Sequence, residues 1–123
     1  MNGKQPRIDF IELHILHHAC AEEIYGLWMI EELASHGYRA SASQLYPKFH
    51  ALEKNGRLRR SERVVGGKVR KYYRATAAGK QYLRRQKSKL IELVAEVLND
   101  DEFRRCLERR KTHSGPSAEV NAR

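Results

Sequence analysis

The fold is decided by residues 41–73, which read SASQLYPKFHALEKNGRLRRSERVVGGKVRKYY. The first part of this stretch predicts a short amphipathic helix, because Leu45, Phe49 and Leu52 recur at helical spacing and share one face. Gly56 follows as the residue best able to end such a helix, since glycine takes a left-handed backbone without a Cβ penalty. The pattern predicts a helix that packs its apolar stripe on a core and exposes its polar faces.

The start of this helix has two possible positions. Ser41 fits an N-cap with Gln44 three residues later, the spacing of a capping box. Pro47 favours a later start with Ser43 as the cap, because a proline inside a helix forfeits a backbone hydrogen bond. The sequence is compatible with both starts.

The second part of the stretch predicts a β-hairpin. Residues 58–65 and 68–73 are strand-forming runs, and Gly66 and Gly67 between them suit a tight primed turn. A polar-faced helix beside a basic hairpin is the outline of a winged helix-turn-helix. The expected fold class is therefore mainly α with a small β-hairpin, a winged helix-turn-helix plus a C-terminal dimerisation helix.

The residues on either side complete this outline. Asp9 is the expected N-cap of a first helix, and a second helix is expected from Gly26 to about His36, before the turn of the helix-turn-helix. Thr76 is expected to cap a long helix after the hairpin. The predicted divisions are a flexible N-terminus (1–7), the winged helix-turn-helix domain (8–76), the C-terminal dimerisation helix or helices (77–111) and a disordered tail (112–123).

Apolar residues after the hairpin predict self-association. Leu83 and Leu90 lie one heptad apart, and apolar residues beyond them continue a seam with a spacing near 3.5 residues. A domain this small has little core left to cover, so the seam is expected to pair with a second copy of the chain. The first helix is apolar on more than one face and is expected to join it. Phe103 and Leu107 of a last short helix are expected to face inward. The predicted interface residues are Phe10, Leu13, Leu83, Leu90, Leu93, Val94 and Val97.

The basic residues are concentrated in one part of the chain, whose formal net charge is +9. Residues 57–89 hold thirteen lysines or arginines against Glu62 alone, whereas residues 1–36 hold six acidic residues against two basic ones. This asymmetry predicts a surface for a polyanion rather than general solubility. Double-stranded DNA is the expected partner. The alternative is a winged-helix protein-interaction module whose basic hairpin binds an acidic partner.

Other classes of protein find little support in the sequence. Cys20 and Cys106 lie far apart, without a CxxC motif or a secretory segment, which favours a reduced cytoplasmic protein. No apolar run approaches the roughly 20 residues of a membrane span. The sequence has no nucleophile–base constellation, no paired carboxylates in a pocket-forming pattern and no glycine-rich phosphate loop, so an enzyme is not expected and no cofactor is implied.

Two features of the first two helices raise the question of a bound ligand. His14 and His18 are four residues apart and could share a helix face with a divalent ion. The chain offers no third ligand at diagnostic spacing, so no metal site is expected. Trp28 could line an effector pocket, since a flat aromatic ring stacks well on a small aromatic or hydrophobic effector. A core or interface position is the more common one for a helix tryptophan in a small domain.

Several residues match a known family in order and spacing. They are Gly26, Leu45-Tyr46-Pro47, Leu52-Glu53, Gly56, Leu58, Arg70-Lys71-Tyr72-Tyr73, Thr76 and Gly79. Over about residues 9–98 the chain resembles the PadR family of bacterial transcriptional regulators, of the shorter size class with a single long C-terminal helix. Family members commonly carry His-Gly-Tyr where this chain has Tyr25-Gly26-Leu27. The resemblance implies a homodimeric repressor whose first and last helices form the dimer interface. In some members, effector binding changes the spacing of the two DNA-reading heads.

The candidate reading residues lie in the predicted recognition helix. Such a helix enters the major groove with its N-terminal part nearest the bases, which selects Ser41, Ser43 and Gln44. A glutamine amide pairs with adenine N6 and N7. Lys48, one turn further on, is expected to reach guanine or a phosphate, and Tyr46 is expected either to contact a phosphate or to pack.

The candidate positioning residues lie in the hairpin and the turn. Their contacts are expected on the DNA backbone or in the minor groove, where they position the protein without reading sequence. Arg39, in the turn, is expected to clamp a phosphate. The wing residues in this set are Arg63, Lys68, Arg70 and Lys71.

Overall fold

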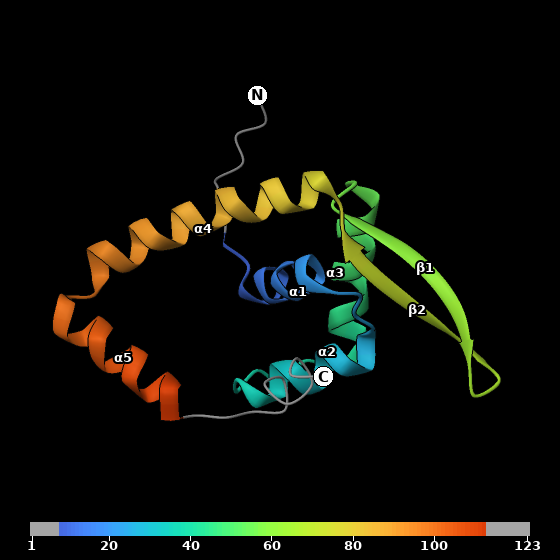
Figure 1. The fold of residues 1–123 in the computed structure, drawn as a ribbon, viewed down its shortest axis with the longest axis horizontal. Coiled ribbons are helices and arrows are strands. Elements are labelled where there is room, and N and C mark those ends of the chain that lie inside the picture. The colour runs from blue at the N-terminus through green and yellow to red at the C-terminus, as the bar shows by residue number, and fades with distance from the viewer. Residues whose placement is uncertain (1–7, 113–123) are drawn as a thin grey trace.

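The computed structural model describes residues 8–112, and these form five helices and one two-stranded antiparallel sheet. In chain order the elements are α1 (Phe10–Ala21), α2 (Gly26–Ser35), α3 (Ala42–Lys54), β1 (Leu58–Val65), β2 (Lys68–Ala75), α4 (Ala77–Val97) and α5 (Asp100–Thr112) (Figure 1). This architecture confirms the predicted fold class. The predicted flexible segment 1–7 and the predicted tail from residue 113 onward lie outside the described residues, whereas residue 112 ends α5 rather than opening the tail.

Side-chain caps begin α1, α4 and α5, the first two at the predicted residues. The carboxylate of Asp9 accepts from the Glu12 backbone N–H at 3.0 Å at the start of α1. The Thr76 hydroxyl accepts from the Gly79 N–H at 3.0 Å and opens α4. Asn99 accepts from the Glu102 N–H at 2.8 Å before α5. Each cap satisfies a backbone donor that has no partner inside its own helix.

The start of α3 decides between the two predicted positions. The helix begins at Ala42 with Ser41 as its N-cap, and the Ser41 N–H donates to the Gln44 side-chain oxygen at 3.0 Å. The later start at Ser43 was therefore wrong, and Pro47 lies inside the helix. Pro47 removes one backbone bond in the second turn, but the closed first turn and the buried apolar stripe hold the helix on both sides of it.

The core lies where the first three helices meet the base of the hairpin. Tyr73 of β2 stacks on Phe49 of α3 with ring centroids 4.5 Å apart, and both side chains are fully buried. The backbones of Ile24 and Tyr73 exchange hydrogen bonds of 2.9 and 2.8 Å, so the α1–α2 linker pairs with β2. Other fully buried side chains in this core are Ile15, Leu16, Met29, Leu33, Leu45 and Leu52.

The hairpin forms the wing, a long ribbon that extends away from this core (Figure 1). Its register pairs Leu58 with Ala75 at the base and Val65 with Lys68 at the tip. Gly66 and Gly67 in the turn have φ values of 59° and 78°. A primed two-residue turn of this kind needs positive φ at both positions, which glycine adopts without strain.

α4 and α5 form an arm at the other end of the molecule (Figure 1). The first half of α4 packs on α1, where the Tyr82 hydroxyl donates to Glu12 Oε1 at 2.8 Å. Beyond it, α4 exposes large apolar side chains, among them Leu93 at 46% and Val97 at 63%. Phe103 and Leu107 of α5, expected to face inward, are exposed in the single chain. In the described part of the chain, no helix is long and apolar enough to cross a membrane.

Candidate nucleic-acid interface

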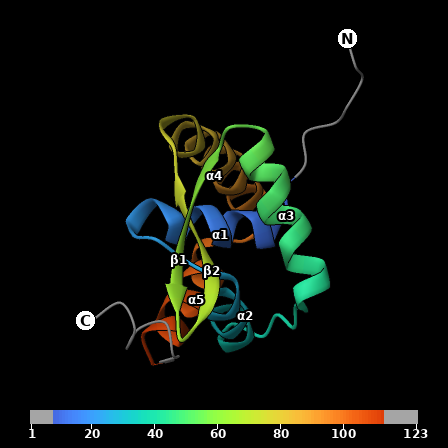
Figure 2. The same ribbon diagram turned by 90° about the vertical axis from the view of Figure 1, so that its right-hand side faces the viewer.

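The recognition helix α3 and the wing lie side by side on one face of the molecule (Figure 2). The start of α2 borders the same face, because α2 packs on α3 and the linker before it pairs with β2. The buried stripe of α3 faces the core, and its first turn projects outward. The fold thus brings the predicted reading residues and the predicted wing residues onto a common surface.

The first turn of α3 presents short polar side chains. Ser41, Ser43 and Gln44 are all exposed, and the hydroxyls of Ser41 and Ser43 lie 2.9 Å apart. The side-chain oxygen of Gln44 accepts the N-cap hydrogen bond, so a base contact by its whole amide would require this bond to open. Arg39, in the turn before α3, is exposed.

Lys48 is engaged within its own chain. Its ammonium group donates to the carboxylate of Asp9, the N-cap of α1, and both side chains are about one-third exposed. Partial burial works to raise the pKa of Asp9, but hydrogen bonds from Lys48 and the Glu12 backbone N–H outweigh burial and hold that pKa below its ordinary value. A contact from Lys48 to DNA would replace this ion pair.

Two wing arginines lie against the body of the molecule. The Arg63 guanidinium lies 3.7 Å from the centre of the Tyr72 ring and donates to Glu23 Oε1 at 3.0 Å. The Arg70 guanidinium lies 4.1 Å from the centre of the Tyr25 ring. The Arg63–Tyr72 contact lies within the wing, whereas the contacts with Glu23 and Tyr25 connect the wing to the α1–α2 linker. Sequence reasoning missed Glu23 and Tyr25 as their partners, since only the pairing of the linker with β2 brings these two residues to the wing, whereas Tyr72 meets Arg63 across the hairpin.

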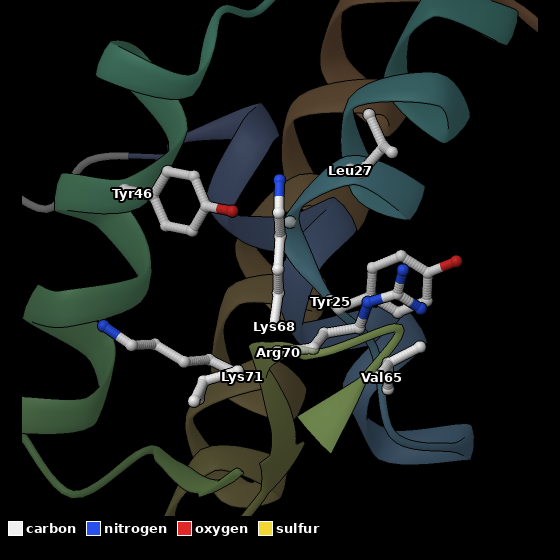
Figure 3. A pocket seen from close by; sticks show the side chains of 9 residues that line it. Tyr25, Leu27, Tyr46, Val65, Lys68, Arg70 and Lys71 are labelled. Atoms are coloured by element: carbon white, nitrogen blue, oxygen red, sulfur yellow. The ribbon is translucent and has the colours of Figure 1, made fainter. Parts of the chain in front are cut away.

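Two wing lysines remain free. Lys68 and Lys71 are exposed, and within residues 8–112 neither ammonium group has a hydrogen bond or an ion pair. They border a pocket of about 400 Å³ lined by residues 25–27 at the start of α2, Tyr46 of α3, and Val65 with residues 68–71 of the wing (Figure 3). We call it the wing pocket. Its lining contains no acidic residue, so it presents a cationic surface to a ligand.

Tyr46 and Gly26 meet at the inner edge of the wing pocket. A Cβ atom on Gly26 would stand 2.2 Å from the Tyr46 hydroxyl oxygen, so only glycine allows the ring to lie where it does. Figure 3 shows this hydroxyl pointing into the space between α2, α3 and the wing. The sequence left Tyr46 between phosphate contact and packing, and the ring does pack while its hydroxyl faces the pocket.

His18 of α1 and His36 at the end of α2 contact the buried carboxylate of Glu32. His18 Nε2 lies 3.2 Å from Glu32 Oε2, and His36 Nε2 lies 2.9 Å from the same oxygen. His14 lies against His36 with ring centroids 5.3 Å apart rather than beside His18. No group of three histidine, cysteine or acidic side chains within residues 8–112 is arranged to hold a metal ion. Burial lowers the pKa of His18 to about 4, with a further contribution from neighbouring His17.

Two other predicted site residues are part of the core of their own chain. Trp28 is 9% exposed and packs edge-to-face against His18 at 5.1 Å, so its surface is occupied by protein. Leu83, predicted at the dimer interface, is 5% exposed and buried against the domain. It has little surface left for a partner. The other predicted interface residues are half-buried or exposed, so they retain surface for a second copy.

Comparison with known proteins gives one consistent result. Residues 15–85 match the model of the transcriptional regulator PadR-like family. The transcriptional regulator Rv3488 of Mycobacterium tuberculosis is 49% identical over 88 residues, which cover 72% of this chain and 82% of that protein.

Solved structures agree with this match. A PadR family transcriptional regulator from Eggerthella lenta superposes with a TM-score of 0.66 at 33% identity, over 71% of this chain and 77% of that one. Bacillus subtilis PadR in complex with operator DNA has a TM-score of 0.59 at 22% identity, over 84% of this chain and 70% of that one. At that identity the second likeness bears on the fold alone.

Proposed function

We propose that this chain, which belongs to the PadR-like family of transcriptional regulators, acts as a homodimeric repressor that binds a palindromic operator in duplex DNA. The observation that carries the proposal is the common face of α3 and the wing, with exposed polar side chains on one and free lysines on the other. Among the proteins of similar fold, Bacillus subtilis PadR forms a complex with operator DNA, the class of ligand proposed for this chain.

The side chains on each element indicate which part of the DNA it contacts. The first turn of α3 carries hydrogen-bonding groups that suit base edges in the major groove, namely Ser41, Ser43 and Gln44. The wing and the turn carry cations that suit phosphates, namely Arg39, Lys68 and Lys71. Arg63 and Arg70 hold the wing against Glu23 and Tyr25 of the α1–α2 linker, so their share in DNA binding is secondary in this proposal.

Dimerisation is supported by the apolar surface of the arm. A groove of about 420 Å³ runs along the second half of α4 to the start of α5, lined by residues such as Leu90, Val94 and Phe103. A palindromic operator requires two reading heads related by two-fold symmetry, and this surface is where a second chain would pack. The spacing between the heads would then depend on how the arms pack. A small hydrophobic effector at the dimer interface would act by changing that spacing.

The test is binding to the DNA upstream of the chain's own gene, followed by fluorescence anisotropy across a range of salt concentrations. We expect affinity to fall steeply with salt, because each phosphate contact releases a counterion. Lys68→Ala and Lys71→Ala should each weaken binding to all sequences and reduce the salt slope by about one. Gln44→Ala should instead relax the preference at one base pair, at about 1–3 kcal/mol.

The matched control is Lys89→Ala, which removes the same charge from an exposed position on α4 away from the proposed face. Affinity that does not respond to salt would overturn the proposal. Regulation that survives Gln44→Ala and Lys48→Ala but is lost in the wing variants would favour the alternative, a module that binds an acidic protein.

A further inference from the structure

We infer that the wing pocket is the seat of a single sugar–phosphate unit of the DNA backbone, clamped between the recognition helix and the wing. The inference rests on the proposed function and makes it specific. In the wing pocket, α3 and the wing would both contact one nucleotide. The position of the wing on the DNA backbone would then fix the register of α3 in the major groove.

The first argument is the set of donors that converge on the wing pocket. The Tyr46 hydroxyl points into it from α3, and no hydrogen bond within residues 8–112 engages that hydroxyl (Figure 3). The Lys68 side chain extends into the same space from β2, and Lys71 borders it with a free ammonium group. Three donors from two separate elements, with no carboxylate between them, suit a phosphodiester oxygen pair.

The start of α2 adds to the positive electrostatic potential of the wing pocket. α2 begins at Gly26, and its N-cap, Tyr25, supplies no side-chain hydrogen bond to the first turn. The open backbone N–H groups and the positive end of the helix dipole border the wing pocket, where they favour an anion. The other helices begin with side-chain hydrogen bonds in the first turn, at Asp9, Ser41, Thr76 and Asn99. The side chains carry the site, and the helix start reinforces it.

The second argument distinguishes a DNA strand from a free anion. Apolar side chains form much of the wall, with Leu27 58% and Val69 62% exposed, and Val65 beside them. A free phosphate ion has no apolar part to cover these groups. A deoxyribose next to the bound phosphate does, and its burial against Leu27 and Val69 would remove apolar surface from water.

Gly26 determines how close the Tyr46 hydroxyl lies to the start of α2. Without a Cβ at this position, the Tyr46 hydroxyl reaches the start of α2, whereas an alanine would overlap the hydroxyl oxygen at 2.2 Å. The same contact keeps Tyr46 directed at the wing pocket rather than at solvent. Gly26 and Tyr46 are therefore positioning and binding residues, respectively, of one phosphate seat.

The experiment removes one phosphate charge at a time. Operator duplexes with a single neutral methylphosphonate at each backbone position are titrated with the wild-type protein, Tyr46→Phe and Lys71→Met. The wild type should lose about tenfold in affinity at one position in each half-site, the loss expected for a hydrogen bond to a charged group. Tyr46→Phe and Lys71→Met should each be weaker on the native duplex but lose much less than tenfold at that same position.

Coupling between one phosphate and these two residues is the decisive result. Lys89→Met, the charge-matched control, should reproduce the wild-type pattern at every position. If Tyr46→Phe lowers the affinity by the same factor at every methylphosphonate position, Tyr46 is not coupled to one phosphate. That result would overturn the inference while leaving the proposed function intact. A wild-type protein that binds no duplex would overturn both. Thermal unfolding of Tyr46→Phe checks that its fold is retained.

A second arm separates the strand from a free anion. Inorganic phosphate and a deoxynucleoside monophosphate are added to the wild-type complex at constant ionic strength. Inorganic phosphate should not displace the duplex beyond the effect of chloride, whereas the monophosphate, which carries the deoxyribose, should displace it weakly. Specific displacement by inorganic phosphate that is lost in Tyr46→Phe would overturn the inference and assign the wing pocket to a free phosphate ligand.

Discussion

The ammonium group of Lys48 on the recognition helix donates to the carboxylate of Asp9, the residue that also caps α1. One carboxylate thus holds the helix that would read DNA and begins a helix of the predicted dimer interface. It accepts from Lys48 through one oxygen and from the Glu12 backbone N–H through the other. The orientation of α3 relative to α1 therefore depends on this ion pair.

Asp9→Asn should destabilise the protein modestly. It should also make the free energy of unfolding less dependent on pH in the acidic range. Asparagine keeps a cap acceptor but loses the charge, and an ion pair whose side chains are about one-third exposed contributes no more than about 1 kcal/mol. The folded-state pKa of Asp9 is depressed, so its stabilisation is present above the unfolded pKa and is lost as pH falls through the folded pKa. Urea denaturation at neutral and acidic pH measures both effects. Asp9→Ala, which also removes the cap, should cost about 1 kcal/mol more than Asp9→Asn.

The same Asp9→Asn variant should bind DNA more tightly if Lys48 contacts a phosphate or guanine. The wild type must break the ion pair before Lys48 reaches DNA, whereas the variant has its lysine already free. A gain of a few-fold, seen in an anisotropy titration, corresponds to an exposed pair of this kind. Asp9→Asn should give no gain in affinity when Lys48 is already methionine, that is, when the double variant is compared with Lys48→Met. An equal gain in that double variant would mean that it comes from the lost negative charge and not from Lys48.

Gly26→Ala should destabilise the fold through its collision with Tyr46. The new Cβ would stand 2.2 Å from the hydroxyl oxygen and 2.6 Å from the ring carbon that bears it. Tyr46→Phe therefore does not relieve the clash, because the ring carbon remains, but Tyr46→Ala does. Overpacking of this kind costs about 1–3 kcal/mol. A double-mutant cycle by urea denaturation should give a favourable coupling for Gly26→Ala with Tyr46→Ala and almost none with Tyr46→Phe.

Local patterns predicted the elements well because they act over a few residues. Asp9, Ser41 and Thr76 begin their helices as their spacing indicated, and Gly66-Gly67 forms the turn. The later helix start at Ser43 was wrong because it rested only on the preference of Pro47 for the first turn of a helix. Burial of the whole apolar stripe of α3 outweighed that preference.

The site depends on contacts that a linear pattern does not contain. Lys48 and Asp9 are 39 residues apart, and Arg63 and Glu23 are 40 apart. Both contacts follow from how the elements pack. Leu83 fits the heptad seam and is buried against its own domain, because periodicity marks an apolar face without saying which partner covers it.

Stability should rise as pH increases from about 4 to 6.5 because of the buried histidine His18. Its folded-state pKa is about 4, against 6.5 for an ordinary histidine. In this window the unfolded chain binds a proton that the folded chain excludes, so unfolding is favoured as pH falls. The full difference corresponds to up to about 3 kcal/mol. Burial also lowers the pKa of His14 and His17, which adds to the slope with the same sign.

The check is the free energy of unfolding measured in urea at steps between pH 4 and 7. His18→Gln should remove part of the slope, since a glutamine has no proton to exclude. The matched control is His50→Gln, the same substitution on the exposed side of α3, away from His18. An unchanged slope in His18→Gln would show that His18 is protonated beside Glu32 in the folded protein rather than held neutral by burial.

Leu93→Asp should convert the proposed dimer to a monomer. Leu93 is 46% exposed on the same half of α4 as Ile91 and Val97, and a carboxylate buried there without a partner costs several kcal/mol at an interface. Ser88→Asp is the matched control, since it adds the same charge to the opposite side of α4. Sedimentation equilibrium should give the dimer mass for the wild type and Ser88→Asp, and the monomer mass for Leu93→Asp. Because the core lies at the other end of α4, the monomer should remain folded and bind a half-site weakly. A dimer that persists in Leu93→Asp would move the interface away from this half of α4.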